Sequence, residues 1–171
     1  MYNKTILVLL LAIAPFGLGR HTVTLNNQPS DFGIYLLRDD TLRTWQAKLL
    51  PLNALDLAPK PLIGINDIES YEWSDHTIKL TKEGLARIRA LQDNKTLTLP
   101  FPFVVVVGNI KIYMGNFFQL YSSYMPADLP YMFPSLEATL TIRRAPDKSI
   151  KDQREDPRIY DALRRRNKLK L

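Results

Sequence analysis

The chain has 171 residues, of which 46% are hydrophobic and 23% are charged, and its net charge is +6. This length and composition predict one globular domain with a real core and exclude a disordered chain. The absence of cysteine excludes a disulfide framework, thiol catalysis, zinc sites built from thiolates and lipid attachment at a lipobox cysteine.

The first nineteen residues, MYNKTILVLLLAIAPFGLG, have the pattern of a secretory signal peptide. An apolar run from Ile6 to Ala14 is followed by Gly17 and Gly19, small residues at the spacing that a signal peptidase requires. The run is about half as long as a stable membrane-spanning helix. We therefore expect a secreted or periplasmic protein, tethered to a membrane if the leader is not cleaved. The lack of disulfides favours a bacterial envelope.

Residues 20–142 are expected to form a single domain. Its first part is predicted to contain two strands, a short helix and a loop, at residues 22–25, 31–37, 41–50 and 51–61. In the helix, Leu42, Trp45 and Leu49 lie at positions i, i+3 and i+7, so we expect them to form its buried face.

The middle of the chain contains the clearest helix. A strand is predicted at 76–80, where apolar and polar residues alternate. Thr81 then has the side chain of a good N-cap for a helix at 82–92, and Glu83 lies where the helix dipole favours a negative charge. Gly84 lowers helix propensity in the first turn, which indicates close approach of another element.

The most apolar segment, PFPFVVVVGNIKIYMGNF, predicts a β-hairpin. Residues 103–107 form a continuous apolar run, as in a strand covered on both faces, and Gly108-Asn109 is a two-residue turn before the returning strand at 110–114. A second helix is expected at 117–124, and strict alternation predicts a strand at 136–142 with one buried face.

Together these elements predict an α+β fold. We expect a small mixed sheet that contains a β-α-β unit and a β-hairpin, with two or three short helices on one face. The β-α-β unit would join strand 76–80, helix 82–92 and strand 103–107 by a right-handed crossover, with the two strands parallel.

The C-terminal segment 143–171 holds the excess positive charge, with eleven Lys or Arg against five Asp or Glu. We expect a flexible or partly helical tail, with a short helix after Pro157. Such a tail suits an anionic lipid or wall polymer, or simply keeps the protein soluble. Nucleic acid is not expected as a partner, because the protein is predicted to be secreted and has no basic platform interleaved with aromatics.

The run HTIKLTKEGLARIRAL, followed by PFVVVVGNIKIYMG, resembles the head of the first periplasmic domain of the protein-export subunit SecD. The similarity covers residues 76–142. It implies a small α+β domain outside the membrane that contacts other polypeptides without chemistry of its own. The chain lacks the multiple membrane spans of that family, so neither the export activity nor any site residue is implied.

Side chains suited to catalysis are few. The chain has two histidines at no metal-ligand spacing, so we expect neither a metal site nor a cofactor. The one acidic concentration offers Asp67, Glu69, Asp75 and His76 as an alternative site. If these side chains converge on one cleft, they would suit a small envelope hydrolase.

Aromatic side chains are concentrated between residues 117 and 133. We take Tyr121, Tyr124, Tyr131 and Phe133 as candidate binding residues, because an apolar patch with a polar rim is typical of a recognition surface. If they point inward instead, they close one end of the sheet. The sequence therefore predicts a non-catalytic binding or structural module whose partner is another envelope polypeptide, and it gives no indication of an oligomeric state.

Overall fold

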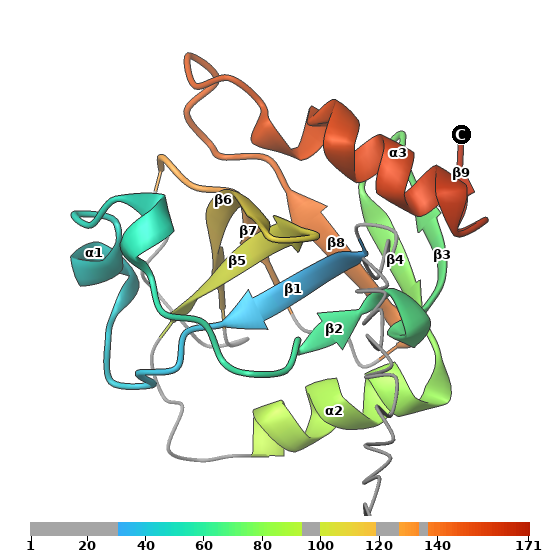
Figure 1. Cartoon of the computed structure of the whole chain (residues 1–171), viewed down its shortest axis with the longest axis horizontal. Helices are drawn as coiled ribbons and strands as arrows, with labels where there is room; N and C mark the ends of the chain where they lie inside the picture. Colours follow the sequence, from blue (N-terminus) through green and yellow to red (C-terminus); the bar gives the residue numbers. More distant parts are fainter. Residues whose placement is uncertain (1–30, 94–99, 119–126, 134–136) are drawn as a thin grey trace, which may run out of the picture.

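The computed structural model describes four ranges of the chain, namely 31–93, 100–118, 127–133 and 137–171 (Figure 1). The predicted signal peptide and the strand expected at 22–25 lie outside these ranges. Within them, no helix is both long enough and apolar enough to cross a membrane.

The described residues form nine strands, three α-helices and three short 3-10 helices. The strands are β1 (Phe32–Leu36), β2 (Ile63–Gly64), β3 (Ile68–Glu72), β4 (Thr77–Leu80), β5 (Phe101–Val107), β6 (Ile110–Phe117), β7 (Tyr131–Met132), β8 (Thr139–Arg143) and β9 (Leu169–Lys170). The helices are α1 (Thr44–Ala47), α2 (Lys82–Asp93) and α3 (Pro157–Arg165), with η1 (Leu52–Ala54), η2 (Ile65–Asp67) and η3 (Gln153–Glu155).

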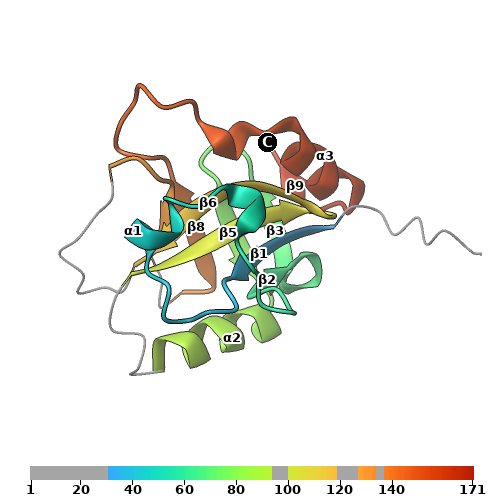
Figure 2. The same ribbon diagram turned by 60° about the vertical axis from the view of Figure 1, so that its left-hand side comes forward.

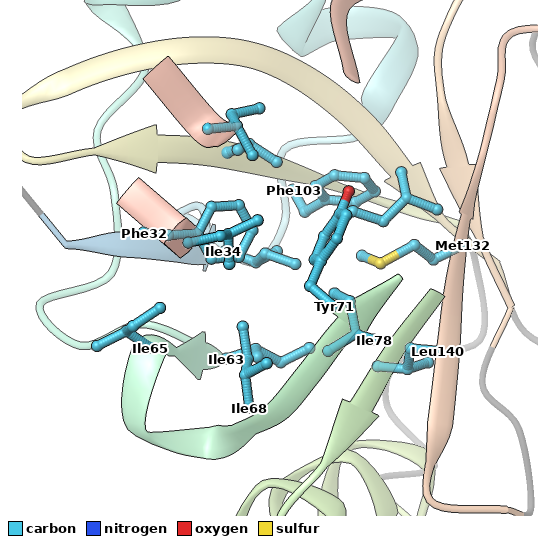
Figure 3. Packing of buried hydrophobic residues seen from close by; sticks show 14 of the residues in the cluster. Phe32, Ile34, Ile63, Ile65, Ile68, Tyr71, Ile78, Phe103, Met132 and Leu140 are labelled. Carbon is cyan, nitrogen blue, oxygen red and sulfur yellow. The ribbon is translucent and has the colours of Figure 1, made fainter. Parts of the chain in front are cut away.

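All nine strands belong to one mixed sheet with the order β2-β1-β5-β6-β7-β8-β4-β3-β9. The sheet curls around its core, because Phe32 of β1 and Tyr71 of β3 meet edge to face at 6.2 Å although their strands lie near opposite ends of this order. Figures 1 and 2 show the two halves of the sheet crossing each other. Figure 3 shows Phe32, Tyr71 and Phe103 pointing into the space that the curl encloses.

The predicted α+β class is confirmed, but the expected small sheet is wrong in size and order. The strands β4 and β5 are not neighbours, since β4 pairs with β3 and β8 while β5 pairs with β1 and β6. The β-α-β unit of adjacent parallel strands is therefore not formed. Helices α2 and α3 lie at the bottom and top of Figure 1 and both pack against the core inside the curl, whereas Ala47 of α1 belongs to a separate apolar cluster.

The hairpin β5–β6 is antiparallel as predicted, and every residue of β5 is buried. Phe103 and Val105 face the main core inside the curl, whereas Val104 and Val106 face a second apolar cluster on the outer side. Leu37, Ala47, Leu55 and other residues of the segment between β1 and β2 complete that second cluster. The continuous apolar run thus reflects a strand covered on both faces, as the sequence indicated.

Helix α2 begins where the sequence predicted. The amide of Gly84 donates to Oγ1 of Thr81 at 3.2 Å, which confirms the N-cap. A Cβ atom at position 84 would lie 2.8 Å from the backbone oxygen of Asp67, so the glycine allows the helix to approach η2 closely. The helix expected at 117–124 differs, because Phe117 is the last residue of β6; residues 119–124 lie outside the described ranges.

The C-terminal segment forms part of the folded domain. Asp156 accepts a hydrogen bond from the amide of Arg158 at 2.9 Å, which caps α3, and Pro157 occupies its first turn. Three side chains of α3 are buried in the main core, namely Ile159, Ala162 and Leu163. β9 then pairs in parallel with β3 at the edge of the sheet. Residues expected to form a tail therefore contribute to the core.

Candidate functional site

An apolar groove lies on the outer side of the hairpin, between the α1–η1 segment and β6. Its volume is about 320 Å³. It is lined by Ala47, Lys48, Leu49, Leu50, Leu52, Leu55, Ile112, Tyr113, Met114, Asp128, Leu129 and Gln153. The groove thus combines leucines from the segment between β1 and β2 with residues of β6, of which Met114 belongs to the outer apolar cluster.

Three large apolar side chains of the α1–η1 segment are exposed to solvent, and two of them, Leu49 and Leu50, line the groove. The exposed fractions are 56% for Trp45, 75% for Leu49 and 46% for Leu50. The sequence predicted Trp45 and Leu49 on a buried face, and this is wrong. Because α1 has only one turn, the i, i+7 spacing does not extend along one face, and Thr44 and Ala47 are buried instead.

Specific polar contacts hold the α1–η1 segment against β6. The hydroxyl of Thr44 donates to Oδ1 of Asn116 at 2.5 Å, and both residues are buried. Lys111 Nζ donates to the backbone oxygens of Asn53 and Leu55, at 3.0 and 2.5 Å. The groove walls are therefore fixed by hydrogen bonds between residues far apart in the sequence.

The aromatic candidates fall into two groups. Tyr121 and Tyr124 lie outside the described residues. Tyr131 and Phe133 are half-buried and form a three-ring cluster with buried Phe118, in which the ring centroids are 5.4 to 5.8 Å apart. These two rings largely contact each other, and neither of them lines the groove.

The hairpin β3–β4 separates the four residues of the acidic candidate site. Asp67 lies at one end of the hairpin, accepts from the Gly64 amide at 2.7 Å and forms an ion pair with Arg87. Glu69 is exposed and pairs with Lys79 at 2.6 Å.

Asp75 and His76 lie in the turn at the other end of the hairpin. Asp75 accepts from the Thr77 amide at 3.0 Å. The structure therefore brings Asp75 and His76 together in one turn and places Asp67 and Glu69 away from them.

His76 is the most unusual polar residue of the described chain. It is only 3% exposed, and it adopts a left-handed backbone conformation with φ of 58°. Its Nδ1 atom lies 2.9 Å from the hydroxyl of buried Tyr71, and the indole of Trp73 meets its ring edge to face at 5.3 Å. Burial, together with the positive charge of Arg154, lowers the pKa of His76 to about 4, so the imidazole is neutral at neutral pH.

Two carboxylates from the C-terminal segment join His76. Ligand atoms of His76, Asp152 and Glu155 all lie within 4.8 Å of one another. Both oxygens of Asp152 accept from the guanidinium of Arg154, at 2.9 and 2.6 Å, and this hydrogen bonding lowers the pKa of Asp152. Arg154 also donates to the backbone oxygen of Ile142 at 2.7 Å, which anchors the segment to β8.

Part of the basic charge of the C-terminal segment is paired with carboxylates. Six of its eleven cationic side chains form ion pairs, namely Arg144, Arg154, Arg158, Arg164, Arg166 and Lys170. One of these pairs, Arg166 with Asp31 at 2.7 Å, connects the end of α3 to the start of β1. Lys170 pairs in the same way with Glu72, so these two pairs fix the segment to the domain and neutralise part of its charge excess.

No known protein family, curated protein or solved structure matches the chain. The resemblance of residues 76–142 to the SecD domain therefore stays a prediction.

Proposed function

We propose that this protein is a non-catalytic module of the bacterial envelope that binds a short apolar segment of another polypeptide in the α1–β6 groove. The observation that carries the proposal is the groove itself, a hollow lined by leucines, Ile112 and Met114. Two of its lining side chains, Leu49 and Leu50, are large, apolar and exposed to solvent. Solvent-exposed apolar surface gathered around one hollow is typical of a site that a partner covers.

The size of the groove favours a few side chains rather than a large ligand. At about 320 Å³ it lies at the lower end of the range for ligand pockets, roughly 300–1,000 Å³. Two or three leucine-sized side chains of a partner would fill this space. Trp45 and Leu49 would then cover the flanks of the bound segment and lose their exposure to water.

The rim of the groove suits a polypeptide. Lys48 and Asp128 line the groove and form an ion pair at 2.9 Å. A polar rim around an apolar centre is the usual anatomy of a protein interface. The partner is therefore expected to be a peptide segment with spaced apolar residues and polar residues between them. Anionic lipid and wall polymer are less well supported, since most cations of the C-terminal segment are paired.

The alternative, a small hydrolase that uses the acidic residues 66–76, has weaker support. Asp67 and Glu69 are held in separate contacts away from Asp75 and His76. No cleft in which all four side chains converge is found among the described residues.

The proposal is tested with a labelled amphipathic peptide that carries leucines at i, i+3, i+4 and i+7. Fluorescence anisotropy should detect binding, and Leu49→Ser should weaken it about tenfold, because burial of one leucine contributes about 1.5 kcal/mol. Ile110→Ser is the matched control, since Ile110 is 51% exposed but does not line the groove. The proposal would be contradicted if Leu49→Ser and Ile110→Ser lost peptide affinity equally. It would also be contradicted if a peptide with serine in place of leucine bound equally well.

A further inference from the structure

The geometry points to a divalent-cation site formed by His76, Asp152 and Glu155, which would take a zinc-like ion. These residues come from the β3–β4 turn and from the segment around η3, and their ligand atoms lie within 4.8 Å of one another. The site uses none of the residues that line the groove, although Gln153, which lines it, lies between Asp152 and Glu155 in the sequence. It places a cation between the sheet and the C-terminal segment.

The histidine is oriented as a ligand. Its ring is almost fully buried, and Nδ1 contacts the Tyr71 hydroxyl at 2.9 Å. With Nδ1–H donating to that hydroxyl, Nε2 carries the lone pair that a metal requires. Among the described residues Nε2 has no hydrogen-bond partner. A hydrogen bond from the second ring nitrogen is the usual way in which a metal-binding histidine is fixed.

The carboxylates complete the ligand set. Glu155 is exposed and makes no hydrogen bond or ion pair with the described residues. Asp152 is more firmly held, because Oδ1 accepts from the amide and Nε of Arg154 while Oδ2 accepts from Nη2. Oδ2 therefore keeps a lone pair for a cation. The guanidinium holds the carboxylate in place, as hydrogen-bond partners of metal ligands commonly do.

The ligand types indicate the class of ion. One imidazole nitrogen and two carboxylate oxygens suit Zn²⁺ and related first-row ions, whereas Ca²⁺ and Mg²⁺ prefer sites made of oxygen alone. The two negative charges of the carboxylates are offset by Arg154 and Arg144, which lie 2.6 and 3.8 Å from Asp152 Oδ2, so a divalent ion would be held by its ligand bonds and not by a local excess of negative charge. Three protein ligands leave at least one position for water.

Bound metal would join two parts of the fold. His76 belongs to the turn between β3 and β4, and Asp152 caps η3 just before α3. A ligand that binds only the folded state stabilises it by mass action. Zn²⁺ at about 100 times its dissociation constant should therefore raise the melting temperature by about 5 °C or more.

The test uses the full folded chain, without an affinity tag, titrated with Zn²⁺ by calorimetry and with Co²⁺ by absorption spectroscopy. We expect one ion per chain, a rise in melting temperature and a visible Co²⁺ spectrum. Mg²⁺ and Ca²⁺ should give no comparable shift. Glu155→Gln should weaken Zn²⁺ binding at least about tenfold while leaving the metal-free melting temperature unchanged, because Glu155 is exposed and unpaired.

Two further variants complete the design. His76→Ala should abolish binding, and His21→Ala, which removes the other histidine, should leave it unchanged. Glu83→Gln removes an exposed carboxylate on α2 and controls for general charge effects. The proposal is overturned if Zn²⁺ does not bind, if the Glu155→Gln variant binds Zn²⁺ as tightly as the wild type, or if the His21→Ala variant loses Zn²⁺ binding.

Discussion

The contact between Gly115 and Phe103 predicts the effect of a single methyl group on stability. The two residues face each other across the β5–β6 pair. A Cβ atom at position 115 would lie 2.7 Å from both Cε atoms of the Phe103 ring and closer still to Cζ. Real Cβ atoms do not come this close, so Gly115→Ala requires the ring or the strand to move.

The size of the stability loss depends on how far the Phe103 ring can move away from the added methyl group. Its side chain is fully buried in the main core and lies against the ring of Tyr113, with centroids 6.4 Å apart. Overpacking of such a site costs about 1–3 kcal/mol. Replacing a strand glycine by alanine gains up to about 1 kcal/mol when space allows, which offsets part of this cost. We therefore expect Gly115→Ala to lower the free energy of unfolding by about 1–2 kcal/mol.

Urea denaturation with an unchanged m-value measures this loss. Gly64→Ala is the control, because a Cβ atom there meets only the edge of Pro61 at 3.2 Å and Asp67 at 3.5 Å. Its effect should stay within about 0.5 kcal/mol. Phe103→Leu should relieve the clash, so the double variant should show a favourable coupling of about 1 kcal/mol or more. A neutral Gly115→Ala, or a double variant in which the losses simply add, would refute the reasoning.

Two more predictions concern the ordered C-terminal segment and buried His76. Leu163→Ala should lower the free energy of unfolding by about 2–4 kcal/mol, because Leu163 is completely buried; a loss under about 0.5 kcal/mol in urea denaturation would mean that α3 does not belong to the core. The pKa of His76 is about 4 in the folded chain, below its ordinary value of 6.5. The unfolded chain therefore binds the proton more readily, so stability should be full above about pH 6.5 and fall by about 2–3 kcal/mol as the pH drops to 4. Urea midpoints in buffers with a chelator measure this fall, and a stability that does not change over that interval would contradict a buried neutral imidazole.

Local patterns in the sequence were sufficient for the hairpin β5–β6 and for α2. Both were predicted from residues that are close in the sequence, namely the continuous apolar run at 103–107 and the capping residue Thr81. Such local patterns predict a strand or a helix start whatever the rest of the fold is. The strand order could not be predicted in this way. β4 pairs with β8, which is far along the chain, and no local signal distinguishes that pairing from the expected pairing with β5.

The candidate sites could not be predicted from the sequence for similar reasons. Trp45 and Leu49 have the spacing of one helix face, which predicts that both are buried. Because α1 ends after one turn, Thr44 and Ala47 are buried instead. Asp152 and Glu155 were assigned to a solvated tail because charged residues surround them. The packing of Ile159 and Leu163 into the core and the hydrogen bond from Arg154 to Ile142 bring that segment to His76. Two apolar residues among so many charges are a weak signal in the sequence.

The emission of Trp45 tests the central proposal most directly, because this side chain is 56% exposed on α1, the helix whose Ala47 lines the groove. The measurement uses a Trp73→Phe background, so that Trp45 is the one tryptophan left, and titrates the leucine-bearing peptide. Binding in the groove should shift the emission to shorter wavelength and protect it from acrylamide, with saturation at the same dissociation constant as the anisotropy signal. Peptide binding that leaves the emission of Trp45 unchanged would place the partner elsewhere and contradict the proposed function.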